Sequence, residues 1–236
     1  MGWRLNKRFY EDAATACGEG GFSVLLDGRP VKTPRGAPLI LPGKALALAI
    51  AQEWQDQPSE IHPETMPLTR LAVTAIDRVR PEREAVVQAV SAYAETDLLC
   101  YRAETPPDLV ARQAQLWQPL LDWCRDFYGV RLRVTTGVIP VEQPPQALHV
   151  LRGAVDACDD PHLAALSTLT ADSGSLILAL ALMAGRIDAA AIWEAALLDE
   201  RYQASKWGED AEALALREAL RADLHGVAEF LALLDR

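Results

Sequence analysis

Two groups of polar residues in this 236-residue chain have the types and spacing that chemistry would need. The first surrounds Asp97. On a continuous helix its carboxylate would lie on an otherwise apolar face with Val90, Tyr93 and Tyr101. A carboxylate there must be satisfied, because an unpaired buried charge is costly. We interpret Tyr93, Asp97, Tyr101 and Arg102 as a structural polar cluster that joins helices. General acid/base catalysis is the alternative, although no second catalytic group lies nearby in the sequence.

The second group is the segment 198–212, where five carboxylates accompany a large aromatic side chain. Asp199, Gln203 and Trp207 share one side of a helix at spacing i, i+4, i+8. We expect Glu209 and Asp210 in the first turn of the next helix, where acids suit the helix dipole. Capping alone does not need Gln203 and an indole, so the pattern also indicates a protein-binding patch. The predicted partner-binding residues are Glu200, Gln203, Trp207, Glu209, Asp210 and Glu212.

Signatures of common enzymes and cofactor sites are missing from the sequence. No phosphate-binding loop occurs, and the glycines at 18–21 precede a strand, whereas a dinucleotide loop opens a helix. The four histidines contain no i, i+4 pair that could hold zinc, and the acidic segment lacks the spacing of a calcium loop. The sequence therefore predicts no catalytic residue, no metal and no cofactor. An enzyme that uses Asp97 or the carboxylates of 199–212 remains an alternative.

The first eighty residues read as a small sheet with one or two helices. Short strands are expected over 22–26, 30–34 and 38–41, with a hairpin turn at Asp27-Gly28. A helix follows Pro42, and apolar residues at i, i+3, i+4, i+7 predict another after Pro67.

Nearly everything after Pro81 has helical character. Helices are expected over 81–101, from 106 with a break or kink at Pro119, and from about 146, 161, 174, 188 and 209. Residues 130–134 alternate with period two and predict a lone strand. The apolar run 176–184 is too short to span a bilayer and indicates a buried helix. The fold class is therefore α+β, with a small N-terminal α/β domain (1–80) and a mostly α-helical C-terminal domain (81–236).

Charge divides the chain at the same place. Residues 1–80 carry ten basic and nine acidic side chains, whereas 81–236 carry thirteen and 24, a balance of −11. A body this acidic repels phosphate backbones, so we expect no nucleic-acid partner. The four cysteines have no paired spacing and the N-terminus has no apolar signal, which favours a reducing, cytoplasmic setting without membrane insertion.

The chain resembles the ATP synthase catalytic-head (F-one) assembly chaperones that bind the alpha subunit. The resemblance lies in an ordered set of motifs from residue 7 to about 234, among them TDLLCYR at 96–102 and WGEDAE at 207–212. The other matching stretches are 7–10, 26–29, 32–34, 46–57, 66–71, 74–77, 117–123, 173–175, 198–200 and Gln203. Tyr202 departs from the pattern, since Trp or Phe is expected there.

This resemblance implies a two-domain chaperone without catalysis or cofactor. Its partner would be the alpha subunit, bound transiently through the surface that later meets the beta subunit. It further implies the bacterial, cytoplasmic form, and we expect a monomer. A structural subunit of another complex is the alternative to a transient chaperone.

Overall fold

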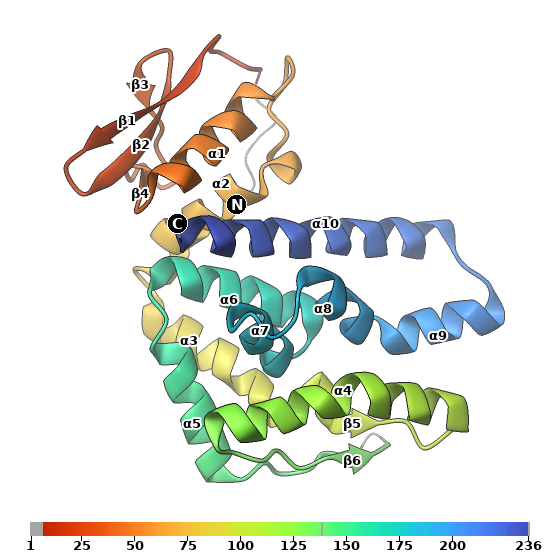
Figure 1. Cartoon of the computed structure of the whole chain (residues 1–236). Coiled ribbons are helices and arrows are strands. Elements are labelled where there is room, and N and C mark those ends of the chain that lie inside the picture. Colours follow the sequence, from red (N-terminus) through yellow and green to blue (C-terminus); the bar gives the residue numbers. More distant parts are fainter. Residues whose placement is uncertain (1–6, 138, 236) are drawn as a thin grey trace. The chain divides into compact units, whose positions relative to one another are not determined.

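The computed structural model describes residues 7–137 and 139–235 (Figure 1). Contacts between residues divide this part of the chain into two compact units. Unit 1 holds the described residues up to Arg83, the segment Asp160–Ala165 and the described residues from Gly226 onward. Unit 2 holds Glu84–Asp159 and Leu166–His225. The helices α6 (Asp160–Ser173) and α10 (Ala211–Leu234) therefore contribute residues to both units.

Unit 1 is built on a small antiparallel sheet. Its strand β2 (Gly21–Leu26) pairs with β1 (Ala13–Gly18) on one side, and with β3 (Arg29–Pro30) and β4 (Ile40–Leu41) on the other. The β2–β3 turn at Asp27-Gly28 has positive φ at both residues, which is the hairpin geometry that the sequence predicts. The helix α1 (Lys44–Gln55) packs against β1 and β2, as Figure 1 shows.

The remaining elements of unit 1 follow α1 in sequence. They are the 3-10 turn η1 (Pro63–Thr65), the helix α2 (Pro67–Thr74) and its π-helical continuation η2 (Ala75–Val79). The Glu53 carboxylate accepts hydrogen bonds from the backbone N–H groups of Leu68 and Thr69, so a side chain of α1 caps the start of α2. Asp77 likewise accepts from the Thr33 hydroxyl at 2.6 Å and fixes the loop after β3.

Unit 2 is mainly helical. Its central helix α7 (Leu176–Met183) is apolar all round and buried over Leu176–Leu182, and it packs against α4 (Pro107–Tyr128). The other elements of this unit are α3 (Arg83–Ala92), which begins in unit 1, η3 (Tyr93–Glu95), η4 (Leu98–Cys100), β5 (Tyr101–Arg102), β6 (Thr135–Thr136), α5 (Pro145–Asp156), α8 (Ala189–Ala196) and α9 (Leu198–Trp207), together with parts of α6 and α10.

Two local predictions were wrong, and a third was wrong in part. The helix expected over 81–101 ends at Ala92 and gives way to two 3-10 turns, so Asp97 does not lie on a helix face. No break occurs at Pro119, because removal of one N–H leaves the rest of the 22-residue helix α4 bonded, while the kink expected there as the alternative stays a prediction. The strand expected over 130–134 lies at Thr135–Thr136, where a parallel partner, β5, is available.

The α+β fold class is confirmed: a small antiparallel sheet with helices precedes a helical region. The division into domains at residue 80 stays a prediction, because the two compact units share helices and independent folding is a separate property. Among the described residues, no helix combines the length and apolar character needed to cross a bilayer.

Candidate functional site

Asp97 is completely buried inside unit 2, where protein donors hold its carboxylate. Its carboxylate accepts hydrogen bonds from the Leu99 N–H at 3.0 Å, the Ser175 hydroxyl at 2.8 Å and the Ile177 N–H at 3.1 Å. Ser175 itself caps α7 by accepting from the Leu178 N–H. Asp97 therefore places its carboxylate at the N-terminus of the most buried helix of the unit, where the helix dipole favours negative charge.

Burial raises the pKa of Asp97 to about 6, against the lowering effect of its hydrogen bonds from Ile177, Ser175 and Leu99. Burial also raises the pKa of the Cys100 and Cys124 thiols to about 12, and the charge of Asp97 adds to both shifts. At neutral pH these two cysteines are thiols rather than nucleophilic thiolates. The surroundings of Asp97 therefore suit a structural cap.

The structure does not gather the other members of the predicted polar cluster around Asp97. Arg102 donates instead to the carbonyls of Leu99 and Gln113, and its guanidinium lies over the Trp117 ring, 5.2 Å from the centroid. Tyr101 pairs with Thr135 in the β5–β6 ladder. Tyr93 begins the 3-10 turn η3 and is partly exposed.

A buried glutamine links this region to the acidic segment. Gln113 accepts from the Ala103 N–H at 2.8 Å and donates to Asp199 at 2.7 Å. Asp199 therefore faces the interior of unit 2 and anchors the start of α9 on α4. This contact could not be inferred from sequence spacing, because 86 positions separate the two residues.

The predicted partner-binding residues lie at the turn between α9 and α10, which we name the α9–α10 corner (residues 198–217). Arg217 of α10 is the centre of this corner, with a side chain only 7% exposed. It pairs with Glu200 at 3.2 Å and with Glu209 at 2.9 Å, and its Nε also donates to the Ala213 carbonyl. Glu200 and Glu209 thus have an internal role in closing the corner, whatever else they contact.

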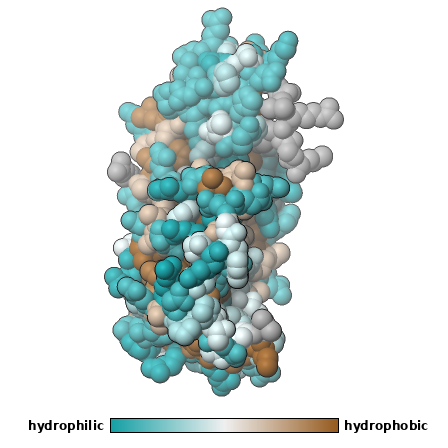
Figure 2. All heavy atoms as spheres, turned by 90° about the vertical axis from the view of Figure 1, so that its right-hand side faces the viewer, coloured by the Kyte–Doolittle hydropathy of each residue, from teal (hydrophilic) through white to brown (hydrophobic). Residues whose placement is uncertain are grey.

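Four predicted residues of the corner remain open to solvent. Trp207 is the last residue of α9 and is 80% exposed, and Gln203 lies one turn before it. Asp210 directly precedes α10, outside its first turn, and Glu212 lies in that turn. Figure 2 shows the face on which α9 meets α10: it is mainly hydrophilic, with brown confined to separate spots. A large exposed indole on such a face is the kind of anchor that protein interfaces use.

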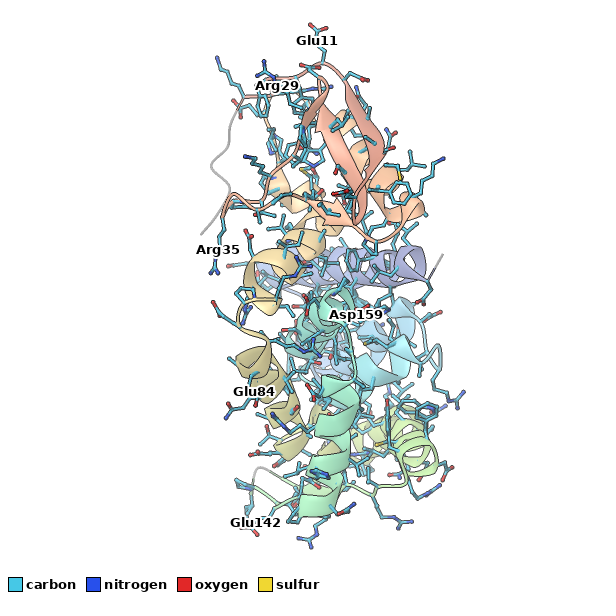
Figure 3. The ribbon with its side chains drawn as sticks, turned by 90° about the vertical axis from the view of Figure 1, so that its left-hand side faces the viewer. Glu11, Arg29, Arg35, Glu84, Glu142 and Asp159 are labelled. Atoms are coloured by element: carbon cyan, nitrogen blue, oxygen red, sulfur yellow. The ribbon has the colours of Figure 1, made fainter. Side chains whose placement is uncertain are left out.

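The face of unit 2 that carries α3 and α5 differs from the α9–α10 corner in its labelled residues. Its labelled residues Glu84, Glu142 and Asp159 are all acidic, as Figure 3 shows. Glu84 pairs with Arg152 of α5 at 2.6 Å. Ion pairs with a partner as exposed as Glu84 (79%) contribute little to binding or stability.

Sequence reasoning missed Arg217 of the corner and Asp108 of α4, which contacts the corner. Arg217 could have been found, because it shares a helix face with Leu220 and Leu224, and a charge on a buried face needs a partner. Asp108 of α4 accepts a hydrogen bond from the Tyr202 hydroxyl at 2.7 Å. This bond gives the unexpected tyrosine a role that a phenylalanine could not fill.

No three His, Cys, Asp or Glu side chains converge to form a metal site anywhere in residues 7–137 and 139–235. Two carboxylates of the corner, those of Glu200 and Glu209, instead pair with one guanidinium, that of Arg217. The arrangement can present a rigid, partly acidic surface to another protein.

Comparisons with known proteins agree on one family. Residues 7–125 match the family model described as ATP12 chaperone protein. Protein atp12, mitochondrial, of Schizosaccharomyces pombe is 28% identical over 214 residues, which cover 86% of this chain and 74% of that protein. The crystal structure of Atp12 from Paracoccus denitrificans is 45% identical, with a TM-score of 0.91, and the match covers 96% of this chain and 97% of that one. A candidate chaperone from Agrobacterium tumefaciens is 40% identical, also with a TM-score of 0.91, over 97% of this chain and 86% of that one.

Proposed function

The chain belongs to the ATP12 chaperone family, which serves ATP synthase assembly, and on this premise we propose that it binds the free alpha subunit. In this proposal the chaperone is a cytoplasmic monomer that shields the surface of alpha destined for the beta subunit. Beta then displaces it. The reaction is an exchange of protein partners and needs no bond chemistry from the chaperone.

The exposure of Trp207 is the observation that carries this proposal to a particular surface. Trp207 is 80% exposed, and burial of its indole ring in an interface would be strongly favourable. Leu214 and Leu216 of α10 are also exposed, by 43% and 66%. We propose that these apolar side chains and their polar neighbours, including Gln203, Asp210 and Glu212, form the contact with alpha.

The corner is held in shape before any partner arrives. Arg217 ties Glu200 on α9 to Glu209 in the connecting turn, and Gln113 holds Asp199. A preformed surface loses less conformational entropy on binding. A contact anchored by a few residues can also be displaced, because beta would bind alpha through a larger and better-packed interface.

Size-exclusion chromatography with light scattering tests this proposal. We expect purified chain and isolated alpha subunit to elute together at one-to-one stoichiometry, and the addition of beta subunit to return the chain to its free position. Alpha subunit that elutes alone in the presence of excess chain would contradict the proposal. A complex that persists with beta present would instead indicate a permanent structural subunit.

A further inference from the structure

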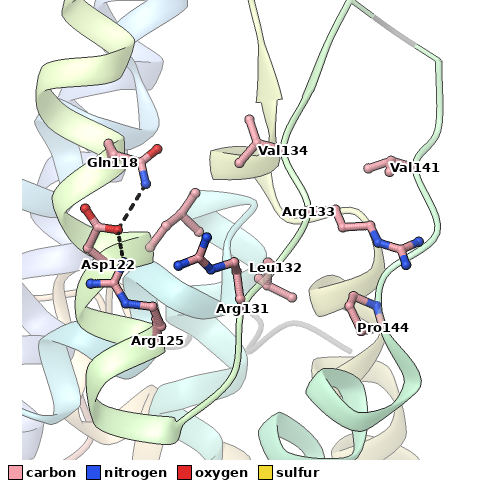
Figure 4. A pocket seen from close by; sticks show the side chains of 10 residues that line it. Gln118, Asp122, Arg125, Arg131, Leu132, Arg133, Val134, Val141 and Pro144 are labelled. Atoms are coloured by element: carbon pink, nitrogen blue, oxygen red, sulfur yellow. Dashed lines mark hydrogen bonds and ion pairs between the residues drawn. The ribbon is translucent and has the colours of Figure 1, made fainter.

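A hollow of about 670 Å³ lies in unit 2, far in sequence from the α9–α10 corner. One wall is α4, and the other is formed by residues 131–134, 141 and 144 of the connection between α4 and α5 (Figure 4). We name it the α4 groove. Its apolar lining includes Leu121, Leu132, Val134, Val141 and Pro144.

Two side chains, those of Gln143 and Arg133, join the two stretches of the outer wall, and the Arg133 guanidinium donates to the Glu142 carbonyl at 3.0 Å. The buried Gln143 accepts from the Arg133 N–H at 2.8 Å and donates to the Arg133 carbonyl at 3.0 Å, as a neighbouring strand would. Leu132 is buried beside it. These bonds join Arg133 to Gln143, and Val134 lies at the groove with 44% of its surface exposed.

The α4 groove is lined by more basic than acidic side chains, whereas residues 81–236 as a whole are acidic. Three of its lining residues are arginines and one is an aspartate. Asp122 is already paired with Arg125 at 2.8 Å, as the dashed line in Figure 4 shows. Among the described residues, neither Arg131 nor Arg133 has a carboxylate partner, although residues 81–236 carry eleven more acidic than basic side chains (24 minus 13).

We propose that the α4 groove is a second docking site, for an extended acidic segment of the client that also carries apolar side chains. Carboxylates of that segment pair with Arg131 and Arg133, and its apolar side chains cover Val134 and Val141. This inference rests on the proposed function, since the client is the alpha subunit. It adds a contact remote in sequence from Trp207.

Charge complementarity selects this occupant. Arginine suits carboxylates because its planar guanidinium can donate two parallel hydrogen bonds. Nucleic acid would also meet the arginines, but the net charge of −10 repels a phosphate backbone. The apolar lining offers nothing to a phosphate chain, whereas it fits the side chains of a peptide.

The test measures the dissociation constant for isolated alpha subunit by fluorescence anisotropy, with full-length chain. The variant R131E/R133E should bind about tenfold more weakly than wild type at low salt. The difference should shrink at 0.5 M salt, because screening removes charge attraction. The matched control R29E/R186E makes the same change in net charge at exposed arginines elsewhere and should bind alpha as wild type does.

Two further measurements show whether the variants are folded and which part of alpha lies in the groove. R131A/R133A, which places no new charge beside Gln143, should retain the wild-type melting temperature and still weaken binding. A photo-crosslinking residue at Val134 should attach to a peptide of alpha that contains Asp or Glu. Equal affinities of wild type and both groove variants for alpha would overturn the inference. Groove variants that lose affinity for an oligonucleotide but keep wild-type affinity for alpha would overturn it as well. Failure of wild type to bind alpha would overturn the proposed function as well.

Discussion

Unit 2 uses carboxylates in two opposite ways. Asp97 is entirely buried, receives three hydrogen bonds from protein donors and has no basic partner among them. Glu200 and Glu209 are about half exposed and pair with one buried guanidinium, that of Arg217. Both arrangements satisfy charge, yet only the second lies at a surface beside an exposed aromatic ring. A motif shared with a family can therefore stabilise the interior or form a contact surface. The burial of its side chains distinguishes these two roles.

The largest expected effect is the loss of stability on replacement of the buried carboxylate, Asp97. Asp97→Ala should lower the free energy of unfolding by about 4 kcal/mol at pH 7, because the donors on Leu99, Ser175 and Ile177 lose their acceptor at roughly 1–3 kcal/mol each. Urea denaturation measures this loss. The control Asp188→Ala removes an exposed helix cap and should cost about 1 kcal/mol. Equal losses in the two variants would end the contrast between the sites.

The second expected effect is a dependence on pH. The pKa of Asp97 is about 6 in the folded protein, against an ordinary value of 3.8. Between pH 3.8 and pH 6 the folded state therefore binds more protons than the unfolded state does. The contribution of Asp97 to stability is therefore greatest at low pH and is lost as pH rises through 6. The cost of Asp97→Ala should be larger at pH 4 than at pH 7 by about 2.5 kcal/mol. A cost that grows from pH 4 to pH 7 would contradict this origin of the shift.

The third effect concerns the α9–α10 corner. Arg217→Met keeps most of the buried stem but releases Glu200 and Glu209, so we expect a loss of about 2 kcal/mol in the free energy of unfolding. Hydrogen exchange should become faster in 198–217. Arg186→Met, at an exposed arginine, should change stability by less than about 0.5 kcal/mol. If the two variants are equally stable, the corner is not held by Arg217.

The contrast also explains what sequence could and could not supply. The α+β class and the Asp27-Gly28 turn follow from local rules, and the structure has them. The position of Asp97 does not, because its partners lie 78 and 80 residues away. The same holds for the strand at Thr135–Thr136, whose pairing with β5 is not local.

Only part of the candidate site could be predicted from the sequence. Spacing placed Gln203 and Trp207 on one side of a helix, but exposure could not be read from spacing. The charge pattern predicted an acidic surface without revealing that Glu200 and Glu209 are committed to Arg217. Charge reversal at those two glutamates would therefore mix folding with binding. Exposed residues outside the Arg217 network are the cleaner probes.

Titration calorimetry of isolated alpha subunit into wild type and Trp207→Ala tests the central claim most directly. The smallest energy of the series is expected here, about 1.4 kcal/mol, or a tenfold weaker dissociation constant. The melting temperature should not change, because Trp207 is 80% exposed. Phe9→Ala, at a 71% exposed aromatic ring of unit 1, should bind as wild type does. A Trp207→Ala variant that binds alpha with wild-type affinity would contradict the account.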